Sequence, residues 1–518
     1  MNRIVVPLAL LLFLPLFGLA APFLFPGSDL LVSGTLSHLW SFVLGGYIAS
    51  TLVLILGVGV GVFILGVGNA WIIASYDFPG KKIFEWALIL PLAVPTYVMA
   101  YLFVDLLQFS GPIQSGLRSM LGMESLWFFP DPRSLSGAIW SFSFCLFPYV
   151  YLITRTAFLE RSGRLIEVSE TLGYSPLQGF MKLVLPMARP AIFAGMALAL
   201  MEVLADFGAV SYFGVQTFAT GIFKAWLSFG GRVAAVQLAL GLLSFVLLIF
   251  FIEQSSRSKL RYASSSRGKT LAKSLRGKGA FFAFAFCGAT LLCGFLLPAF
   301  ALVQLLFKQG LTIDIRYLDW LSNSLSVSVL TAVISVVLAV FFAYSVRMNA
   351  RLSWVNRLLG FGYALPGAVL AIGILSFLEI FQLAWWISAS MLVLVYAYLV
   401  RFLSSSLQSV EAGLARITPS MDASAALLGL SKAQILRRVH VPLLKRSLIT
   451  AGLFGFVDVM KELPATLLLR PFNFDTLAVA TYQLAADERL AELALPSLTI
   501  VLVGLFPVLL LSRVISKS

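Results

Sequence analysis

Long apolar stretches recur from one end of the sequence to the other, and they constrain the fold more than any other feature. About twelve of them approach the roughly 20 largely apolar residues that a helix needs to cross a bilayer. Hydrophobic residues make up 60% of the 518-residue chain and charged residues 12%, against about 45–50% and about 25% in soluble domains. The sequence therefore predicts an all-α, polytopic membrane protein. The expected transmembrane helices are residues 4–24, 46–72, 86–108, 136–157, 190–212, 233–252, 280–305, 322–346, 358–382, 385–405, 447–469 and 492–512.

A basic segment rich in Ser and Gly separates the first six stretches from the last six. It reads SSRSKLRYASSSRGKTLAKSLRGKG and has no acidic residue, so it is too polar to cross a membrane. We predict a first module over residues 1–253, a cytoplasmic linker over 254–279 and a second module over 280–518.

The distribution of positive charge predicts the orientation of the chain. Lys and Arg gather in alternate loops, which marks those loops as cytoplasmic. Arg3, Arg513 and Lys517 then place both termini in the cytoplasm. A cleaved signal peptide ending near Gly18–Ala21 is the alternative for the first stretch. A retained helix is favoured, because cleavage would put the basic linker outside.

A polar segment occurs twice, as EVSETLGYSPLQGFMKLVLP (Glu167–Pro186) and as ASAALLGLSKAQILRRVHVP (Ala423–Pro442). The copies align without gaps at an offset of 256 residues. Upstream, LPLAVP and LPGAVL match at an offset of 275. Because both halves have an even number of expected helices and begin on the same side, we predict two parallel six-helix modules rather than inverted repeats.

Each polar segment predicts a helix, a glycine turn, a short helix and a proline in the first turn of the next membrane helix. Gly173 and Gly429 can adopt the positive φ that ends a helix, and Pro186 and Pro442 suit a first helical turn. An ordinary cytoplasmic loop would also be charged and helical. The equal Gly-to-Pro spacing of 13 residues at matching positions instead favours a segment that another protein grips.

The two segments resemble the EAA signature of ABC importer permeases, which is Glu-Ala-Ala, three residues, Gly, nine residues and Ile-x-Leu-Pro. The first copy reads Glu167-Val-Ser, Gly173 and then Leu-Val-Leu-Pro186. The second has Ala423-Ser-Ala with Asp422 one position earlier, so the role of the signature Glu is carried over to Glu167 alone. The resemblance implies the type I importer permease fold, with Gly173, Pro186, Asp422, Gly429 and Pro442 in two coupling helices that dock on ATP-binding subunits.

The stretch MKELPATLLLRPFNFDTLAVATYQLAADERLAELALP resembles the C-terminal region of the fused permeases of ferric iron importers. This resemblance implies ferric iron as transported substrate, a periplasmic binding protein that delivers it, two copies of an ATP-binding subunit that binds ATP and Mg, and the bacterial inner membrane. It implies no cofactor in this chain. No nucleic acid partner is expected, because the net charge of +14 is distributed between the apolar stretches, where it indicates topology. Fused thiamine permeases share the plan and are the alternative.

Nothing in the sequence predicts an ATPase in this chain. Arg267-Gly268-Lys269-Thr270 approaches a P-loop, but Ala263 stands where the motif requires Gly. We therefore expect a non-enzyme, with ATP hydrolysis in a separate subunit. A transporter driven by an ion gradient is an alternative of another class, but it would have no ATPase to dock. A membrane enzyme is disfavoured because no catalytic constellation is evident.

Charged residues inside membrane helices are functional candidates. Glu202 and Asp206 pair with Asp458 and Glu462 at the same 256-residue offset. Within each pair the i, i+4 spacing predicts one shared helix face. Carboxylates are hard oxygen ligands that suit ferric iron, so we predict that these four line the translocation path. The alternative is that they pair with bases such as Lys461 and fix helix packing.

Overall fold

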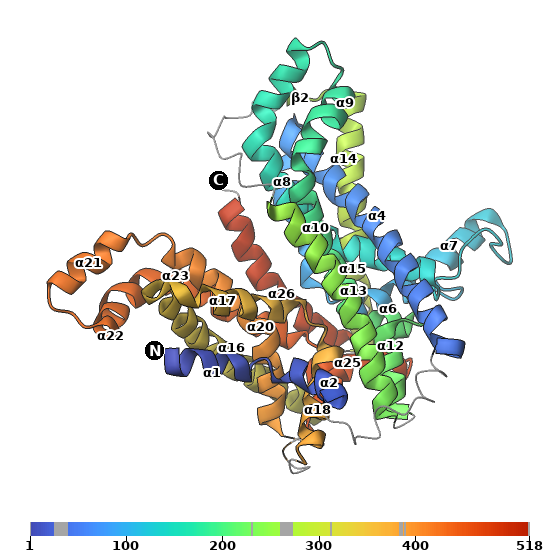
Figure 1. The fold of residues 1–518 in the computed structure, drawn as a ribbon. Helices are drawn as coiled ribbons and strands as arrows, with labels where there is room; N and C mark the ends of the chain where they lie inside the picture. The colour runs from blue at the N-terminus through green and yellow to red at the C-terminus, as the bar shows by residue number, and fades with distance from the viewer. Residues whose placement is uncertain are drawn as a thin grey trace. The chain divides into compact units, whose positions relative to one another are not determined.

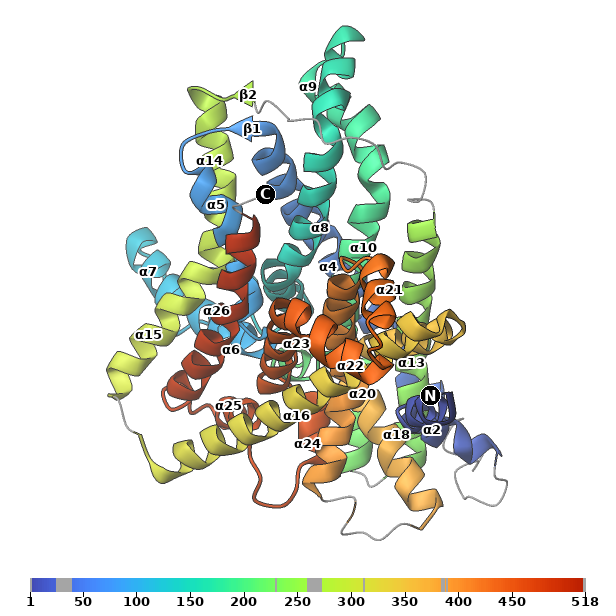
Figure 2. The ribbon, with the colours of Figure 1, turned by 90° about the vertical axis from the view of Figure 1, so that its left-hand side faces the viewer.

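A computed structural model describes residues 2–24, 40–228, 231–258, 273–310, 313–382, 387 and 390–515. These residues are mainly helical, as Figure 1 shows, which confirms the predicted all-α class. The one pair of strands among them is β1 (Tyr76–Asp77) and β2 (Lys273–Ser274), which run parallel, so the end of the basic linker lies beside the chain that follows α4 (Figure 2). Arg267–Thr270 lies outside the described residues.

The elements follow one another along the chain in the order below, where η marks a short 3₁₀ or π turn. They are α1 (Asn2–Leu11), α2 (Leu14–Leu24), η2 (Trp40–Leu44), α4 (Gly45–Ser75), β1, α5 (Lys81–Ala87), η3 (Leu90–Ala93), α6 (Thr96–Leu107), α7 (Pro112–Leu121), α8 (Leu135–Thr171), α9 (Pro176–Gly179), η4 (Phe180–Val184), α10 (Leu185–Ala205), α11 (Gly208–Tyr212), α12 (Phe218–Phe223), η5 (Lys224–Ser228), α13 (Arg232–Ser258), β2, α14 (Lys278–Leu291), η7 (Leu292–Leu296), α15 (Leu297–Gln309), α16 (Ile315–Met348), η8 (Ala350–Leu352), α17 (Ser353–Gly360), η9 (Phe361–Ala364), α18 (Gly367–Ile380), α20 (Met391–Leu414), α21 (Pro419–Leu427), α22 (Lys432–Ile435), η10 (Leu436–His440), α23 (Val441–Met460), α24 (Pro464–Leu469), α25 (Leu477–Ala486) and α26 (Ala494–Ile515).

Seven helices in the described part of the chain are long and apolar enough to cross a membrane, and the number is ten if each of three helix pairs, bent by 53°, 98° and 110°, forms one span. The seven are Ser41–Ser75, Leu135–Leu159, Leu177–Ala205, Arg232–Ser255, Lys278–Lys308, Ile315–Met348 and Met391–Leu414. The bent pairs coincide with the expected spans 4–24, 86–108 and 358–382. The two remaining expected spans correspond to α23 followed by α24 and to α26. The chain is therefore a multi-pass membrane protein.

One compact unit comprises residues 38–221, 241–311 and 484–518, and its centre is the packing of α4, α8 and α10. Small residues on α4 allow α8 to approach closely. A Cβ placed on Gly61 would lie 2.0 Å from the Ser143 Oγ, and one on Gly66 would lie 2.6 Å from the Val150 Cβ. The opposite side of α4 exposes apolar side chains such as Leu56 and Val60, as expected of a surface that faces lipid.

The other compact unit comprises residues 1–37, 222–240 and 312–483, and it is built on α16, α20 and α23. In this unit α2 packs tightly against α18. A Cβ on Gly18 would lie 2.0 Å from the Gly373 carbonyl oxygen, and one on Gly373 would lie 2.2 Å from that of Pro15. The compact units are thus not the two contiguous halves of the sequence, because the first helix groups with helices of the second half. The modules 1–253 and 280–518 remain a prediction about the sequence repeat.

The contact between α2 and α18 gives a direct test of this packing. Gly373→Ala should destabilise the protein by about 1–3 kcal/mol, because its new methyl group meets backbone that cannot rotate away. Gly360→Ala is the matched control, since nothing lies within 4 Å of a Cβ at that position. Thermal unfolding in detergent micelles measures both variants, and equal midpoints would contradict the packing.

Candidate functional site

The first polar segment forms a helical hairpin in which both arms are helices that continue toward the membrane. α8 runs unbroken to Thr171, and the chain then turns at Gly173, whose φ is 72°. α9 follows and passes through η4 into α10. The predicted glycine turn is confirmed. Glu167 lies within α8, and its side chain is outside the described residues.

The second polar segment repeats this course at the same offset, with one difference. Gly429 has a φ of 79°, α22 follows, and η10 leads into α23. The π turns η4 and η10 begin at Phe180 and Leu436, which are again 256 residues apart. The difference is that α20 ends at Leu414 and a separate helix, α21, begins at Pro419, where the first segment has the continuous α8.

The π turns explain how a proline is accommodated inside a continuous helix. Pro186 and Pro442 each occupy the second residue of the membrane helix, as predicted. A proline lacks the N–H and its ring clashes with the carbonyl group four residues earlier, so a regular helix would break there. The wider π turn directly before each proline relieves this conflict. The short helix is therefore not a separate element: α9 with α10, and α22 with α23, each form one continuous helical rod.

A reciprocal hydrogen-bond pair stabilises the start of each short helix. The Ser431 hydroxyl accepts from the Gln434 N–H at 3.4 Å, and the Gln434 side chain accepts from the Ser431 N–H at 2.8 Å. Ser175 and Gln178 make the same two bonds at 3.3 and 3.1 Å. This capping box is not among the residues predicted from the sequence. The Ser-x-x-Gln spacing in both copies was the signal that could have found it.

Apolar side chains stand exposed around both glycine turns. Leu427 and Leu428 are 88% and 82% exposed, and Leu177 in the first segment is 71% exposed. Leu172 and Met181 are also exposed. Exposed apolar groups on charged, water-facing segments indicate a surface for protein contact.

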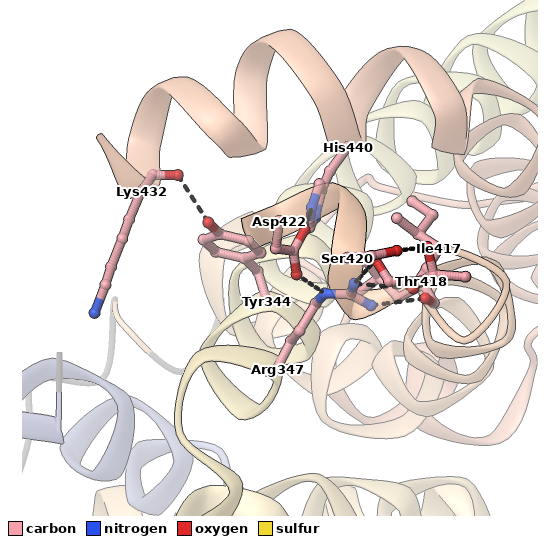
Figure 3. Close-up of polar contacts among 9 residues, drawn as sticks. Tyr344, Arg347, Ile417, Thr418, Ser420, Asp422, Lys432 and His440 are labelled. Carbon is pink, nitrogen blue, oxygen red and sulfur yellow. Dashed lines mark hydrogen bonds and ion pairs between the residues drawn. The ribbon is translucent and has the colours of Figure 1, made fainter. Parts of the chain in front are cut away.

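Asp422, which directly precedes the second segment on α21, is the centre of a polar cluster shown in Figure 3. Its Oδ2 accepts from the Arg347 Nε at 2.8 Å, and its Oδ1 lies 2.5 Å from the His440 Nε2. His440 is fully buried, and its ring packs edge-on against the ring of Tyr344, with 5.3 Å between the ring centroids. The Tyr344 hydroxyl donates to the Lys432 carbonyl oxygen at 2.8 Å.

Arg347 also completes the end of α20. Its guanidinium donates to the carbonyl oxygens of Leu414 at 2.8 Å and Ile417 at 2.9 Å. Leu414 is the last residue of α20, and its carbonyl also accepts from the Ile417 N–H at 3.1 Å, while Ile417 lies in the turn that follows the helix. Arg347 thus adds a side-chain partner at the end of a helix, where carbonyl groups lack the regular helical partners. Burial raises the pKa of Asp422, but hydrogen bonds from Arg347 and His440 and their charges outweigh burial and hold the pKa below its usual value. The Asp422 carboxylate is therefore ionised at neutral pH.

The predicted path carboxylates lie at helix ends, which corrects part of their prediction. α10 ends at Ala205 and α23 at Met460, so Asp206 and Glu462 do not continue the helices that carry Glu202 and Asp458. The expectation that each pair shares one face of a continuous helix is wrong. The reason is that the second carboxylate of each pair, Asp206 or Glu462, bonds to the N-terminus of the next short helix and so stabilises a break between two helices.

The two capping carboxylates make equivalent contacts in their own units. Asp206 accepts from the N–H groups of Ala209 at 2.8 Å and Val210 at 3.3 Å, and from the Thr96 hydroxyl. Glu462 accepts from the N–H groups of residues 465 and 466 at 2.9 and 3.0 Å. Both carboxylates thus hold the start of a short helix, α11 in one unit and α24 in the other.

Basic partners of the second pair agree with the packing alternative. The Arg401 Nη1 donates to the Glu462 Oε1 at 3.0 Å, and the Lys461 Nζ lies 3.9 Å from the Asp458 Oδ1. Within the described residues, no group of three or more His, Cys, Asp or Glu side chains is placed to hold a metal ion. Contact of the four carboxylates with iron remains a prediction.

Residues 63–262 match the family described as binding-protein-dependent transport system inner membrane component. This domain, with the apolar helices, makes the chain a multi-pass inner-membrane permease of an ABC importer. Such permeases work with an ATP-binding subunit and a substrate-binding protein.

Three relatives illustrate how far the similarity extends. The chain is 29% identical to the Fe(3+)-transport system permease protein FbpB 2 of Haemophilus influenzae, over 90% of this chain and 89% of that protein. It is 30% identical to the sulfate transport system permease protein CysT of Salmonella typhimurium, over 29% of this chain and 51% of that protein. It is 28% identical to the putative molybdenum transport system permease protein YvgM of Bacillus subtilis, over 38% of this chain and 86% of that protein.

The contacts of Asp422 predict how its contribution to stability depends on pH. A carboxyl group with a lowered pKa stabilises the fold above its unfolded pKa and loses that effect as the pH falls through the folded value. Asp422→Asn should therefore cost about 1–3 kcal/mol at neutral pH. The difference from the wild type should not shrink between pH 8 and about pH 5, and it should close only below about pH 4. Unfolding midpoints across this range measure it, and a difference that vanishes near neutrality would contradict the ion pair.

Proposed function

We propose that the chain is the membrane-spanning permease of an importer for ferric iron. The observation that carries the proposal is similarity over nearly the whole of both chains to a protein named as an Fe(3+)-transport permease. In this proposal a periplasmic binding protein delivers the iron, and the ATP-binding subunits bind ATP and Mg. The permease itself hydrolyses nothing and holds no cofactor, and both of its termini face the cytoplasm.

Import of an oxyanion is the second candidate, because sulfate and molybdenum permeases are also similar to this chain. Their similarity extends over 29% and 38% of the chain, against 90% for the ferric relative. The shorter matches to the sulfate and molybdenum permeases support a common permease domain more than a common substrate. Thiamine is a further alternative substrate, because fused thiamine permeases share the two-module plan.

We call the two polar segments, Glu167–Pro186 and Ala423–Pro442, with the helices that lead into them, the coupling segments. They support docking of two ATP-binding subunits, one on each. The exposed leucines beside Gly173 and Gly429 would enter an apolar groove on each subunit, where their burial is favourable. ATP binding draws the two subunits together and moves both segments. Because each short helix is continuous with α10 or α23, the movement passes directly into a membrane helix.

Loss of the chain from its own host tests the substrate. A deletion strain should lose uptake of labelled ferric iron and retain uptake of sulfate, molybdate and thiamine. Expression of the intact chain should restore iron uptake. Loss of sulfate or molybdate uptake with normal iron uptake would overturn the proposal in favour of the oxyanion candidate.

The exposed leucines provide a test of docking. Leu427→Asp with Leu428→Asp should remove most of the ATP hydrolysis that copurifies with the chain in mild detergent, because a buried charge without a partner is costly. Phe472→Asp is the matched control, since Phe472 is 91% exposed but lies between α24 and α25 in the chain, outside both segments. Unchanged copurification in the double variant would contradict docking at this segment.

The carboxylates of the first pair can be tested for contact with the ion apart from their role in packing. Asn at position 206 keeps an oxygen that can cap α11 but removes the charge. Glu202→Gln with Asp206→Asn should therefore abolish iron uptake while assembly and ATP hydrolysis persist. Normal iron uptake in this variant would leave these side chains a purely structural role.

A further inference from the structure

The second coupling segment differs from the first in sequence at two equivalent positions of the repeat. Asp422 lies 256 residues after Ile166, and His440 the same distance after Val184. The first copy therefore has apolar residues where the second has a carboxylate and an imidazole. The second copy in turn lacks the signature Glu, having Ala423 in its place.

The carboxylate of the second segment points toward its own unit. Asp422 is held between Arg347, at the end of α16, and His440, at the end of η10 (Figure 3). Its side chain is only 20% exposed. Both oxygens therefore have partners inside the unit, and little of the group is left for a protein docking from outside.

The same cluster crosses the break that is unique to the second segment. Arg347 donates at once to Asp422 on α21, to the carbonyl oxygen of Leu414 at the end of α20 and to that of Ile417 between the two helices. Because α20 and α21 are separate helices, the residues between them could bend. A planar guanidinium with several donors in fixed directions is suited to join two such elements, whereas an ammonium group is not.

The second arm of the hairpin, α22, is also hydrogen-bonded to α16. Tyr344 lies one turn before Arg347 on α16, and its hydroxyl donates to the Lys432 carbonyl oxygen at the start of α22. α16 thus contacts both arms of the second hairpin, on either side of the Gly429 turn. The hairpin cannot move far without either carrying α16 and α20 along or breaking these contacts.

We propose that Asp422, Arg347, His440 and Tyr344 form an internal brace that fixes the second coupling segment to α16 and α20. The brace makes this segment a rigid lever, whose carboxylate positions the lever and does not contact the ATP-binding subunit. The two segments then have unequal roles: the first bears the signature Glu167, and the second is stiffened from within. This inference rests on the proposed docking of ATP-binding subunits at both segments.

The test compares Asp422→Asn and Arg347→Lys with the control Arg351→Lys in the complete transporter. Arg351 is an exposed arginine close to Arg347 in the chain. Three quantities are measured: the ATP-binding subunit retained, the substrate imported per ATP hydrolysed, and the rate of backbone hydrogen exchange in residues 415–435. The third quantity is also measured on the permease alone.

We expect both brace variants to retain the ATP-binding subunit within about twofold of wild type, and Arg351→Lys to match wild type throughout. In the brace variants, hydrogen exchange in residues 415–435 should rise about tenfold, the change that loss of one such contact produces. Import per ATP should fall by a similar factor, because ATP hydrolysis then bends the segment instead of moving α16 and α20.

Two results would overturn the brace. One is release of the ATP-binding subunit by Asp422→Asn with unchanged hydrogen exchange, which would mean that the carboxylate contacts the subunit directly. The other is unchanged exchange and unchanged import per ATP in both variants. Failure of the wild type to bind a subunit would instead count against the proposed function, and hydrogen exchange on the permease alone would still test the brace.

Discussion

Unpaired backbone groups at helix breaks are the constraint on which this structure depends. Inside a bilayer no water is available to bond them, so each break near the membrane needs a side chain that does so. Asp206 and Glu462 bond the free N–H groups that begin α11 and α24, and Arg347 bonds the carbonyl groups of Leu414, the last residue of α20, and of Ile417 just beyond it. The signs follow the helix dipole, with anions at N-termini and a cation at a C-terminus.

This constraint also explains why intramembrane charges are difficult to interpret from sequence. A carboxylate in an apolar stretch indicates function because burial is costly, yet a capping carboxylate offsets that cost with backbone hydrogen bonds. The sequence places Asp206 and Glu462 at equivalent positions of the two repeats, and the structure gives them equivalent caps. Repetition therefore identifies a shared role, but it does not distinguish contact with an ion from support of a helix break.

Local features were predictable because they depend on residues close in the chain. The positive φ of Gly173 and Gly429 and the positions of Pro186 and Pro442 follow from backbone chemistry. The same reasoning could have found the capping boxes at Ser175 and Ser431. Contacts between distant residues were not predictable: nothing in the sequence pairs Arg347 with Asp422, or Arg401 with Glu462. The helix ends at Ala205 and Met460 were missed because apolar residues resume after the charged residues at each break, so the sequence pattern predicts a single helix across it.

The contact of Gly18 with Gly373 has a consequence for biosynthesis. The two glycines are about 355 residues apart, so at about 5–20 residues per second the ribosome needs roughly 20 to 70 s to make the second after the first. During that time α2 rests in the membrane with its small-residue face against lipid or an insertion factor. A chain interrupted before α18 leaves this face of α2 without the helix that covers it in the complete fold.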